Sequence, residues 1–348
     1  MANERALIGM SGGVDSSVAA RLMQNTSHCT GATMHLYADA EDAIRDARTV
    51  CDHLGMEHMV LDLQEEFSRL VIRDFIDTYE QGRTPNPCIR CNFRLKFGIL
   101  LDKALELGYD AVVTGHYARI RRDAQTGRYL LYKAADEKKD QTYFLACLNQ
   151  HQLAHSRFPL GELTKEEVRA IAQEIGLITA RKKDSQDICF VPDGDYVAFM
   201  EDYTGKTYPG GNYVDLSGNV IGCHKGAVCY TIGQRKGLGI ALGSPAYVCA
   251  KDMKENTVTL GPNEALFADT LLAEDFNWIP FPILTEPMRV EAKIRHSQFA
   301  QSAMVYPEEN GFVKVVFDQP QRAISPGQAV VLYHGDMVIG GGTIARSV

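Results

Sequence analysis

The stretch RALIGMSGGVDSSVAARLM, residues 5–23, places a glycine pair between a short apolar run and a second run with helical spacing. This change of period predicts a strand, a tight turn at residues 11–16, and a helix. Adjacent glycines and serine hydroxyls at a helix start offer donors and positive potential to a phosphate chain. The stretch lacks the GxxxxGKS/T pattern of a Walker A loop, including its lysine. It therefore predicts a phosphate-binding turn of another type.

Strands and helices alternate over the following hundred residues or so. Apolar runs predict strands over 30–37, 56–63 and 109–120, and amphipathic spacing predicts helices over 41–54, 65–81 and 95–107. This alternation is typical of an α/β fold with a doubly wound parallel sheet, whose ligands bind beyond the carboxyl ends of the strands.

The pattern changes after about Pro192. Residues 163–177 form the last clear helical pattern, and Thr164 with Glu167 predicts a capping box at its start. From Lys206 onward, short alternating runs separated by glycine, proline and asparagine predict two β-rich units. We therefore expect an α/β catalytic domain, a small central β-rich domain and a C-terminal β-barrel, over residues 1–195, 196–265 and 266–348.

The composition points to a cytoplasmic protein without membrane contact. The first ten residues lack the basic and apolar regions of a secretory signal, and no stretch of eighteen apolar residues occurs. The nine cysteines are an odd number in a long chain and do not indicate a disulfide framework.

The net charge of −8 argues at first against a nucleic-acid partner, but the charge is unevenly distributed. Residues 119–139 carry seven lysines and arginines against three acids. A solvated face is the ordinary interpretation of such a run, and contact with a phosphate backbone is the alternative.

The cysteines divide into two groups by their neighbours. Six lie among apolar or strand-like residues and are expected to be packing residues: Cys29, Cys51, Cys147, Cys223, Cys229 and Cys249. Cys88, Cys91 and Cys189 lie in stretches predicted as loops, where a thiol has polar neighbours and is accessible to substrates. Structural zinc is disfavoured because the chain has no second Cys-x-x-Cys pair. A thioredoxin-like redox pair is disfavoured because Cys88 follows Asn-Pro.

The SGGVDS turn resembles the PP-loop of N-type ATP pyrophosphatases, which cleave ATP between the α and β phosphates and use AMP to activate an oxygen. Seven motifs, spread from Gly9 to Gly342, resemble the tRNA-specific 2-thiouridylase family and occur in its order. They are GMSGGVDSSVAA (9–20), GRTPNPCIRCN (82–92), TGHYARI (114–120), KKDQTYFL (138–145), ARKKDSQDICFVP (180–192), YTIGQRKGLGI (230–240) and SPGQAVVLYHGDMVIGGG (325–342).

The resemblance implies an ATP-dependent sulfurtransferase that thiolates C2 of the wobble uridine, U34, of tRNA. In that family the uridine oxygen is adenylated, and a persulfide on the residue that matches Cys189 attacks C2. The thiol that matches Cys91 then releases the thiouridine and leaves a Cys91–Cys189 disulfide. A sulfur-relay protein fed by a cysteine desulfurase supplies the sulfur. We expect Arg90, Arg94 or Lys96 to lower the pKa of Cys91.

The resemblance also assigns binding residues. Positions that match the family's ATP site, with Asp15 placed on Mg²⁺ as a catalytic residue, are Gly9, Met10, Ser11, Gly12, Gly13, Val14, Asp15, Ser16, Met34 and Gly115. Positions that match the target-base site or contacts with the anticodon stem-loop are Asn86, Pro87, Cys88, His116, Lys139, Asp140, Gln141, Arg295, His296 and Gln328. Taken alone, His116 would be a hydrogen-bonded histidine at a strand end.

Three alternatives stay open at this point. Relatives often carry aspartate where this chain has Cys88, so Cys88, Cys91 and Cys189 could instead ligate a [4Fe–4S] cluster that binds hydrosulfide. A PP-loop amide or amine ligase that uses ammonia is a second enzyme class. A tRNA-binding iron–sulfur protein without catalysis is a third possibility.

Overall fold

A computed structural model describes residues 4–37, 40–177 and 188–348 of the chain. Within these residues, a five-stranded sheet has the order β3-β2-β1-β4-β7, and each neighbouring pair is parallel. Its strands are β1 (Glu4–Gly9), β2 (Ser27–His35), β3 (His58–Asp62), β4 (Ala111–Val113) and β7 (Ser156–Arg157). The strand order reverses between β1 and β4, which is the position where sheets of this kind bind ligands.

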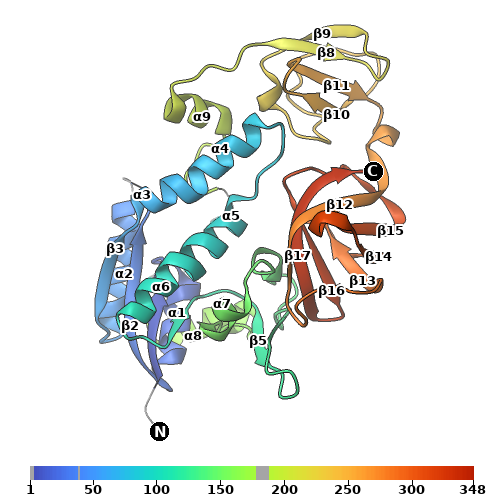
Figure 1. The fold of residues 1–348 in the computed structure, drawn as a ribbon. Coiled ribbons are helices and arrows are strands. Elements are labelled where there is room, and N and C mark those ends of the chain that lie inside the picture. Colours follow the sequence, from blue (N-terminus) through green and yellow to red (C-terminus); the bar gives the residue numbers. More distant parts are fainter. Residues whose placement is uncertain (1–3, 38–39, 178–187) are drawn as a thin grey trace.

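Helices cover both faces of this sheet (Figure 1). The α-helices are α1 (Val14–Met23), α2 (Glu41–His53), α3 (Gln64–Phe67), α4 (Arg73–Glu80), α5 (Pro87–Arg90), α6 (Leu100–Glu106), α7 (Gln150–Ala154), α8 (Lys165–Glu174) and α9 (Tyr196–Thr204). Two π-helical segments, η2 (Ser68–Ile72) and η3 (Cys91–Ile99), join α3 to α4 and α5 to α6. Short 3₁₀ turns are η4 (Thr142–Phe144), η6 (Ala227–Cys229), η7 (Asn263–Leu266) and η8 (Glu309–Gly311).

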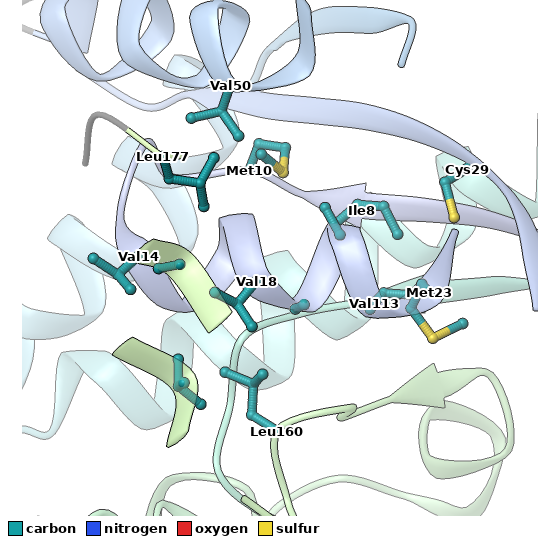
Figure 2. Close-up of a cluster of buried hydrophobic side chains, with 14 of the residues drawn as sticks. Ile8, Met10, Val14, Val18, Met23, Cys29, Val50, Val113, Leu160 and Leu177 are labelled. Carbon is teal, nitrogen blue, oxygen red and sulfur yellow. The ribbon is translucent and has the colours of Figure 1, made fainter. Parts of the chain in front are cut away.

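The alternation of side chains along β1 produces two separate cores. Ile8 belongs to a core that also contains residues of α1 and α2 together with Leu160 and Leu177 (Figure 2). Leu7 points to the other face and packs with Phe97 and the apolar residues of α6. Burial on both faces explains why these strands read as nearly continuous apolar runs. The doubly wound parallel sheet predicted from the sequence is confirmed.

Two local predictions were wrong. The strand expected over 109–120 is only three residues long, because the chain turns at Thr114 and starts a separate hairpin. The loop expected around the Cys-x-x-Cys pair is a helix that begins at Pro87 and continues without a break through η3 to Glu106 (Figure 1). Asn86 caps this helix by accepting the Ile89 N–H at 3.3 Å, and proline at the first position needs no donor.

The rest of the chain is mostly β-structure. Of the described strands, β8 (Gly211–Val214), β9 (Val220–His224), β10 (Tyr247–Asp252) and β11 (Thr257–Gly261) form a central sheet in the order β10-β11-β8-β9. A C-terminal antiparallel barrel is closed by pairing between its first and last strands. Its strands are β12 (Phe267–Trp278), β13 (Met288–Lys293), β14 (Gln301–Pro307), β15 (Val313–Arg322), β16 (Ala329–His334) and β17 (Met337–Ser347).

A hairpin from the first domain joins the barrel. Strands β5 (Arg119–Arg122) and β6 (Tyr129–Tyr132) extend the barrel sheet beyond β17 through a pairing of Tyr132 with Met337. The Lys133 N–H donates to the Asp336 carbonyl at 2.8 Å, which strengthens this junction. The basic residues of the hairpin therefore lie beside the barrel.

Candidate functional site

The turn after β1 is shaped by its glycines and serines. Gly12 has a φ of +69°, and a Cβ there would lie 2.8 Å from the Asp46 Cβ, so glycine is required on both counts. The Ser11 and Ser16 hydroxyls share a hydrogen bond of 3.1 Å, and the Ser17 hydroxyl donates to the Gly13 carbonyl at 2.8 Å. These bonds fix the backbone at the start of α1, where the helix dipole favours an anion.

The turn after β4 packs directly on this loop. A Cβ at Gly115 would lie 2.6 Å from the carbonyl carbon of Asp15 and 2.7 Å from the Ser16 nitrogen. The two turns at the reversal of strand order are therefore in contact, and only glycine fits between them. Gly9 and Met10 continue β1 into the loop, and the half-buried Met34 lies on the adjacent β2. The residues expected to bind ATP are thus gathered at one sheet edge.

Asp15 has two partners that the sequence did not indicate. The Lys165 ammonium donates to both of its carboxylate oxygens, at 2.8 and 2.9 Å. The Tyr117 hydroxyl donates to Oδ1 at 2.8 Å. The Asp15 side chain keeps 31% of its surface exposed, which is compatible with a Mg²⁺ ion held mainly by phosphate oxygens and one carboxylate.

The three cysteines of interest come from two segments. Cys88 lies on α5 and Cys91 begins η3, whereas Cys189 lies beyond residues 178–187, which are outside the described residues and include most of the ARKKDSQDICFVP motif. All three thiols are free; Cys88 and Cys189 are exposed and Cys91 is half-buried. They are close enough together to influence one another electrostatically.

Their pKa values run against the expectation of an activated thiol. Desolvation by the surrounding protein raises the pKa of Cys88 and of Cys91, and it raises the pKa of Cys189 to about 11, although solvent reaches Cys88 and Cys189. The Lys96 ammonium lowers the pKa of all three thiols but does not overcome desolvation. The predicted net lowering for Cys91 is therefore wrong. Arg90 pairs with Asp74 at 3.2 Å instead.

The π-helical winding of η3 places Lys96 near Cys91. Residues five apart lie on opposite sides of an ordinary α-helix but are neighbours where the hydrogen bonds run from i to i+5. Cys91 and Lys96 have this spacing. The π-helical winding therefore places the Lys96 ammonium near the thiols. The spacing of apolar residues in the sequence did not predict a π-helix here.

His116 links the phosphate loop to the cysteine helix. It is 9% exposed, and its Nδ1 shares a hydrogen bond of 2.7 Å with the Thr114 hydroxyl. Its ring packs against Phe97 and Phe158 with centroids 5.8 Å away. Burial lowers the pKa of His116 well below its ordinary value, so the ring is neutral at physiological pH. Its neighbour Gly115 touches Asp15, and Phe97 follows Lys96, so the two sites are adjacent.

Most of the residues expected to contact tRNA take part in interactions within the chain. Asp140 accepts from the Ala134 N–H at 3.0 Å and from the Thr142 hydroxyl at 2.6 Å. Gln141 Oε1 accepts from the Tyr117 N–H at 2.9 Å, so it supports the residue that contacts Asp15. The neighbouring Lys139 donates its N–H to the Asp136 carbonyl at 3.0 Å, so this segment turns back on itself.

The residues expected to contact tRNA from the barrel also make contacts within the chain, and one of them reaches the segment before the cysteine helix. Gln328 donates to the Pro85 carbonyl at 2.9 Å, so it fastens the barrel to the segment before Cys88. Arg295 donates to the Ser325 hydroxyl at 2.8 Å and the Ala323 carbonyl at 2.9 Å. The ring of His296 lies 4.5 Å from that of Phe144.

A cavity of about 420 Å³ lies between the cysteine helix and the barrel. Its lining includes Asn86, Arg90 and Arg94 from the helical side and Glu274 and Asn277 from β12. Of the predicted target-base residues only Asn86 lines it, and neither Cys88 nor Cys91 does. The helix that carries the cysteines therefore turns its arginines toward the cavity, whereas its two thiols lie outside the cavity lining.

Neither a ready-made metal site nor a membrane-spanning helix occurs in the described part of the chain. Among these residues, no group of three or more histidine, cysteine or acidic side chains is arranged to hold a metal ion. No helix within residues 4–37, 40–177 and 188–348 is long and apolar enough to span a bilayer.

Comparisons with known proteins cover the whole chain. The tRNA methyl transferase HUP domain matches residues 4–193, the tRNA methyl transferase PRC-barrel domain matches 197–262, and the aminomethyltransferase beta-barrel domain matches 268–344. A tRNA-specific 2-thiouridylase MnmA from Acetivibrio thermocellus is 49% identical over 358 residues, covering 99% of this chain and 100% of that protein. One from Clostridioides difficile is 47% identical over 358 residues and covers 99% of both.

One solved structure with a similar fold has a much lower sequence identity. The U34-tRNA thiolase NcsA from Methanococcus maripaludis, solved with its [4Fe–4S] cluster, shares 18% identity and a TM-score of 0.37. The match covers 58% of this chain and 67% of that one.

Proposed function

The chain belongs to the tRNA-specific 2-thiouridylase family, and from that premise we propose that it thiolates C2 of the wobble uridine, U34, of tRNA at the expense of ATP. The observation that carries the proposal is the adjacency of a phosphate loop and a cluster of thiols. Gly115 touches the loop at Asp15, and its neighbour His116 packs against Phe97 on the helix that carries Cys91. An adenylated base and a sulfur donor could therefore meet there.

ATP would bind with its phosphates at the start of α1. The backbone N–H groups of residues 12–16 and the helix dipole supply the positive potential there. Asp15 would hold Mg²⁺ together with phosphate oxygens. Transfer of AMP to the C2 oxygen of uridine turns a poor leaving group into a good one.

Sulfur would then arrive through Cys189. Because its pKa is raised to about 11, its plain thiol is protonated at neutral pH. A persulfide is more acidic and would be ionised, which supports a persulfide on Cys189 as the attacking species. It would attack C2 as AMP leaves. The Cys91 thiolate would next attack the bond between the two sulfurs, releasing 2-thiouridine and leaving a Cys91–Cys189 disulfide.

These steps require a tRNA substrate and a protein that supplies sulfur. We propose the anticodon stem-loop of tRNA as the substrate and a sulfur-relay protein or cysteine desulfurase as the donor, in the cytoplasm. The division at residues 1–195, 196–265 and 266–348 would give catalysis to the first part and tRNA contacts to the barrel. Basic residues of the β5–β6 hairpin lie beside the barrel and would extend the RNA surface.

One assay tests this function against both alternatives. Purified protein is mixed with ATP, Mg²⁺, unmodified tRNA, a cysteine desulfurase with cysteine as persulfide donor and a thiol reductant, and AMP and thiolated nucleoside are measured. We expect both products. Pyrophosphate release without thiolation would favour the amide or amine ligase, and tRNA binding without ATP cleavage would favour a non-catalytic binding protein.

A further inference from the structure

Lys165 occupies a position that folding alone disfavours. It is the first residue of α8, where the helix dipole repels a cation, and it is only 4% exposed. Burial of an ammonium group is costly unless it is closely paired. Two unfavourable features at one residue suggest that it serves a purpose other than stability.

The pairing of Lys165 directs its charge at the phosphate loop. Its ammonium lies 2.8 and 2.9 Å from the carboxylate oxygens of Asp15, in the first turn of α1. Tyr117 donates to the same carboxylate at 2.8 Å, and the ammonium lies 5.8 Å from the centre of the Tyr117 ring. The ammonium is therefore one carboxylate away from the helix start where an anion would bind.

The loop itself supplies no positively charged side chain, since residues 9–17 contain neither lysine nor arginine. In Walker A loops, a lysine of the loop reaches the β- and γ-phosphates. We propose that Lys165 provides this charge here, from a helix that lies 150 residues later in the chain, and that it contacts the β- or γ-phosphate of ATP. In this arrangement Asp15 holds the ammonium in place and shares it with the nucleotide.

This proposal rests on ATP being the substrate, as proposed above. A merely structural role for Lys165 would consist of fastening α8 to α1. The two roles differ in what they predict for nucleotides of different length, because AMP lacks the β- and γ-phosphates. A phosphate contact affects ATP far more than AMP, whereas a structural role affects both equally.

The test is the binding of ATP and of AMP, measured by titration calorimetry on the full chain. We expect Lys165→Met to weaken ATP binding about 30-fold, as the loss of a charge-assisted contact predicts, and to change AMP binding less than about threefold. Lys165→Gln, which can still donate to Asp15 but carries no charge, should do the same and serves if the methionine variant does not fold. Lys165→Arg should restore part of the preference for ATP.

A matched control is Arg157→Met, which removes a different ion pair, with Glu4, on β7 and β1. It should lower thermal stability without changing the ratio of ATP to AMP affinity. Equal losses for ATP and AMP in the Lys165 variants, or unchanged ATP binding, would overturn the proposal while the function stands. Failure of the wild-type chain to bind ATP would overturn both.

Discussion

The phosphate loop and the thiol site lie next to each other but are built in opposite ways. In the loop, the serines are hydrogen-bonded, Gly12 and Gly115 fill positions that admit no side chain, and Asp15 accepts from two partners. At the thiol site the cysteines are free, two of them are exposed, and desolvation raises all three pKa values.

This difference indicates where each site obtains its reactivity. A site of fixed dipoles is ready for its ligand when the chain has folded. A site of protonated thiols gains a nucleophile only when sulfur is loaded or a proton is removed. Substitutions at the two sites should therefore fail in different ways.

The largest effect is expected for the sulfur-carrying thiols. Cys189→Ala and Cys91→Ala should each eliminate thiouridine formation, measured by nucleoside chromatography after multiple turnovers with tRNA, ATP, a persulfide donor and a thiol reductant that reopens the Cys91–Cys189 disulfide. Neither should prevent ATP binding, because the loop does not depend on the thiols.

Cys88→Ala is the control within the same helix. Because the proposed persulfide route uses only Cys91 and Cys189, it should keep at least about a third of the activity under anaerobic conditions. Complete loss in this variant, with an iron-dependent absorbance in the wild type, would instead favour the cluster.

Asp15→Ala should lower AMP formation by about 10³-fold, because it removes the carboxylate proposed to hold Mg²⁺ and to position Lys165. It should also lower the free energy of unfolding by about 3 kcal/mol, because it removes a carboxylate partner from a buried ammonium. Radiometric AMP release and thermal melting measure the two effects. The affinity for tRNA should change less than about threefold in a filter-binding assay.

Tyr117→Phe removes one donor to Asp15 but keeps the carboxylate. It should lower AMP formation by less than about tenfold.

For the Asp15→Ala variant, normal AMP formation would exclude the phosphate-loop assignment.

Gly115→Ala tests the contact between the two turns. Its Cβ would lie 2.6 Å from the backbone of Asp15, so the turns must separate. We expect a loss of about 2 kcal/mol in the free energy of unfolding by urea and weaker ATP binding. Gly243→Ala, whose Cβ would meet no atom within 4 Å, should cost less than about 0.5 kcal/mol. Similar losses for both would contradict the tight packing described here.

The smallest effect is expected at the RNA surface. Lys139→Ala should weaken tRNA binding a few-fold and reduce the slope of log affinity against log salt by about one. Lys254→Ala, at an exposed turn of the central sheet, is the control with the same charge change. An unchanged salt slope for Lys139→Ala would leave residues 119–139 as an ordinary solvated face.

The sequence predicted those features whose causes lie within a few residues. The turn at residues 11–16 and the capping box of Thr164 and Glu167 are both confirmed, because each depends on neighbouring groups. The helix at Pro87 was missed although its start signal, Asn-Pro, was present. The two prolines of TPNP also favour an extended loop, so the local signals at this point conflict.

Other features depend on contacts that no local pattern encodes. The approach of Lys165 to Asp15 spans 150 residues, and no local pattern in the sequence indicated it. The raised pKa values of Cys88, Cys91 and Cys189 come from desolvation by segments that are distant in the sequence. The basic residues nearby in the sequence instead predicted a lowered pKa.

The hairpin on the barrel edge ties the folding of two distant parts of the chain together. Strand β17 pairs with β12 to close the barrel and also meets β6, which precedes it by more than two hundred residues. During synthesis the β5–β6 edge must wait for β17, and an unpaired edge can add a strand from another chain. Contacts this remote slow folding. The pairing of β6 with β17 positions the basic hairpin. It also leaves the β6 edge unpaired in a newly made chain until the barrel is complete, and during that time the edge can pair with another chain.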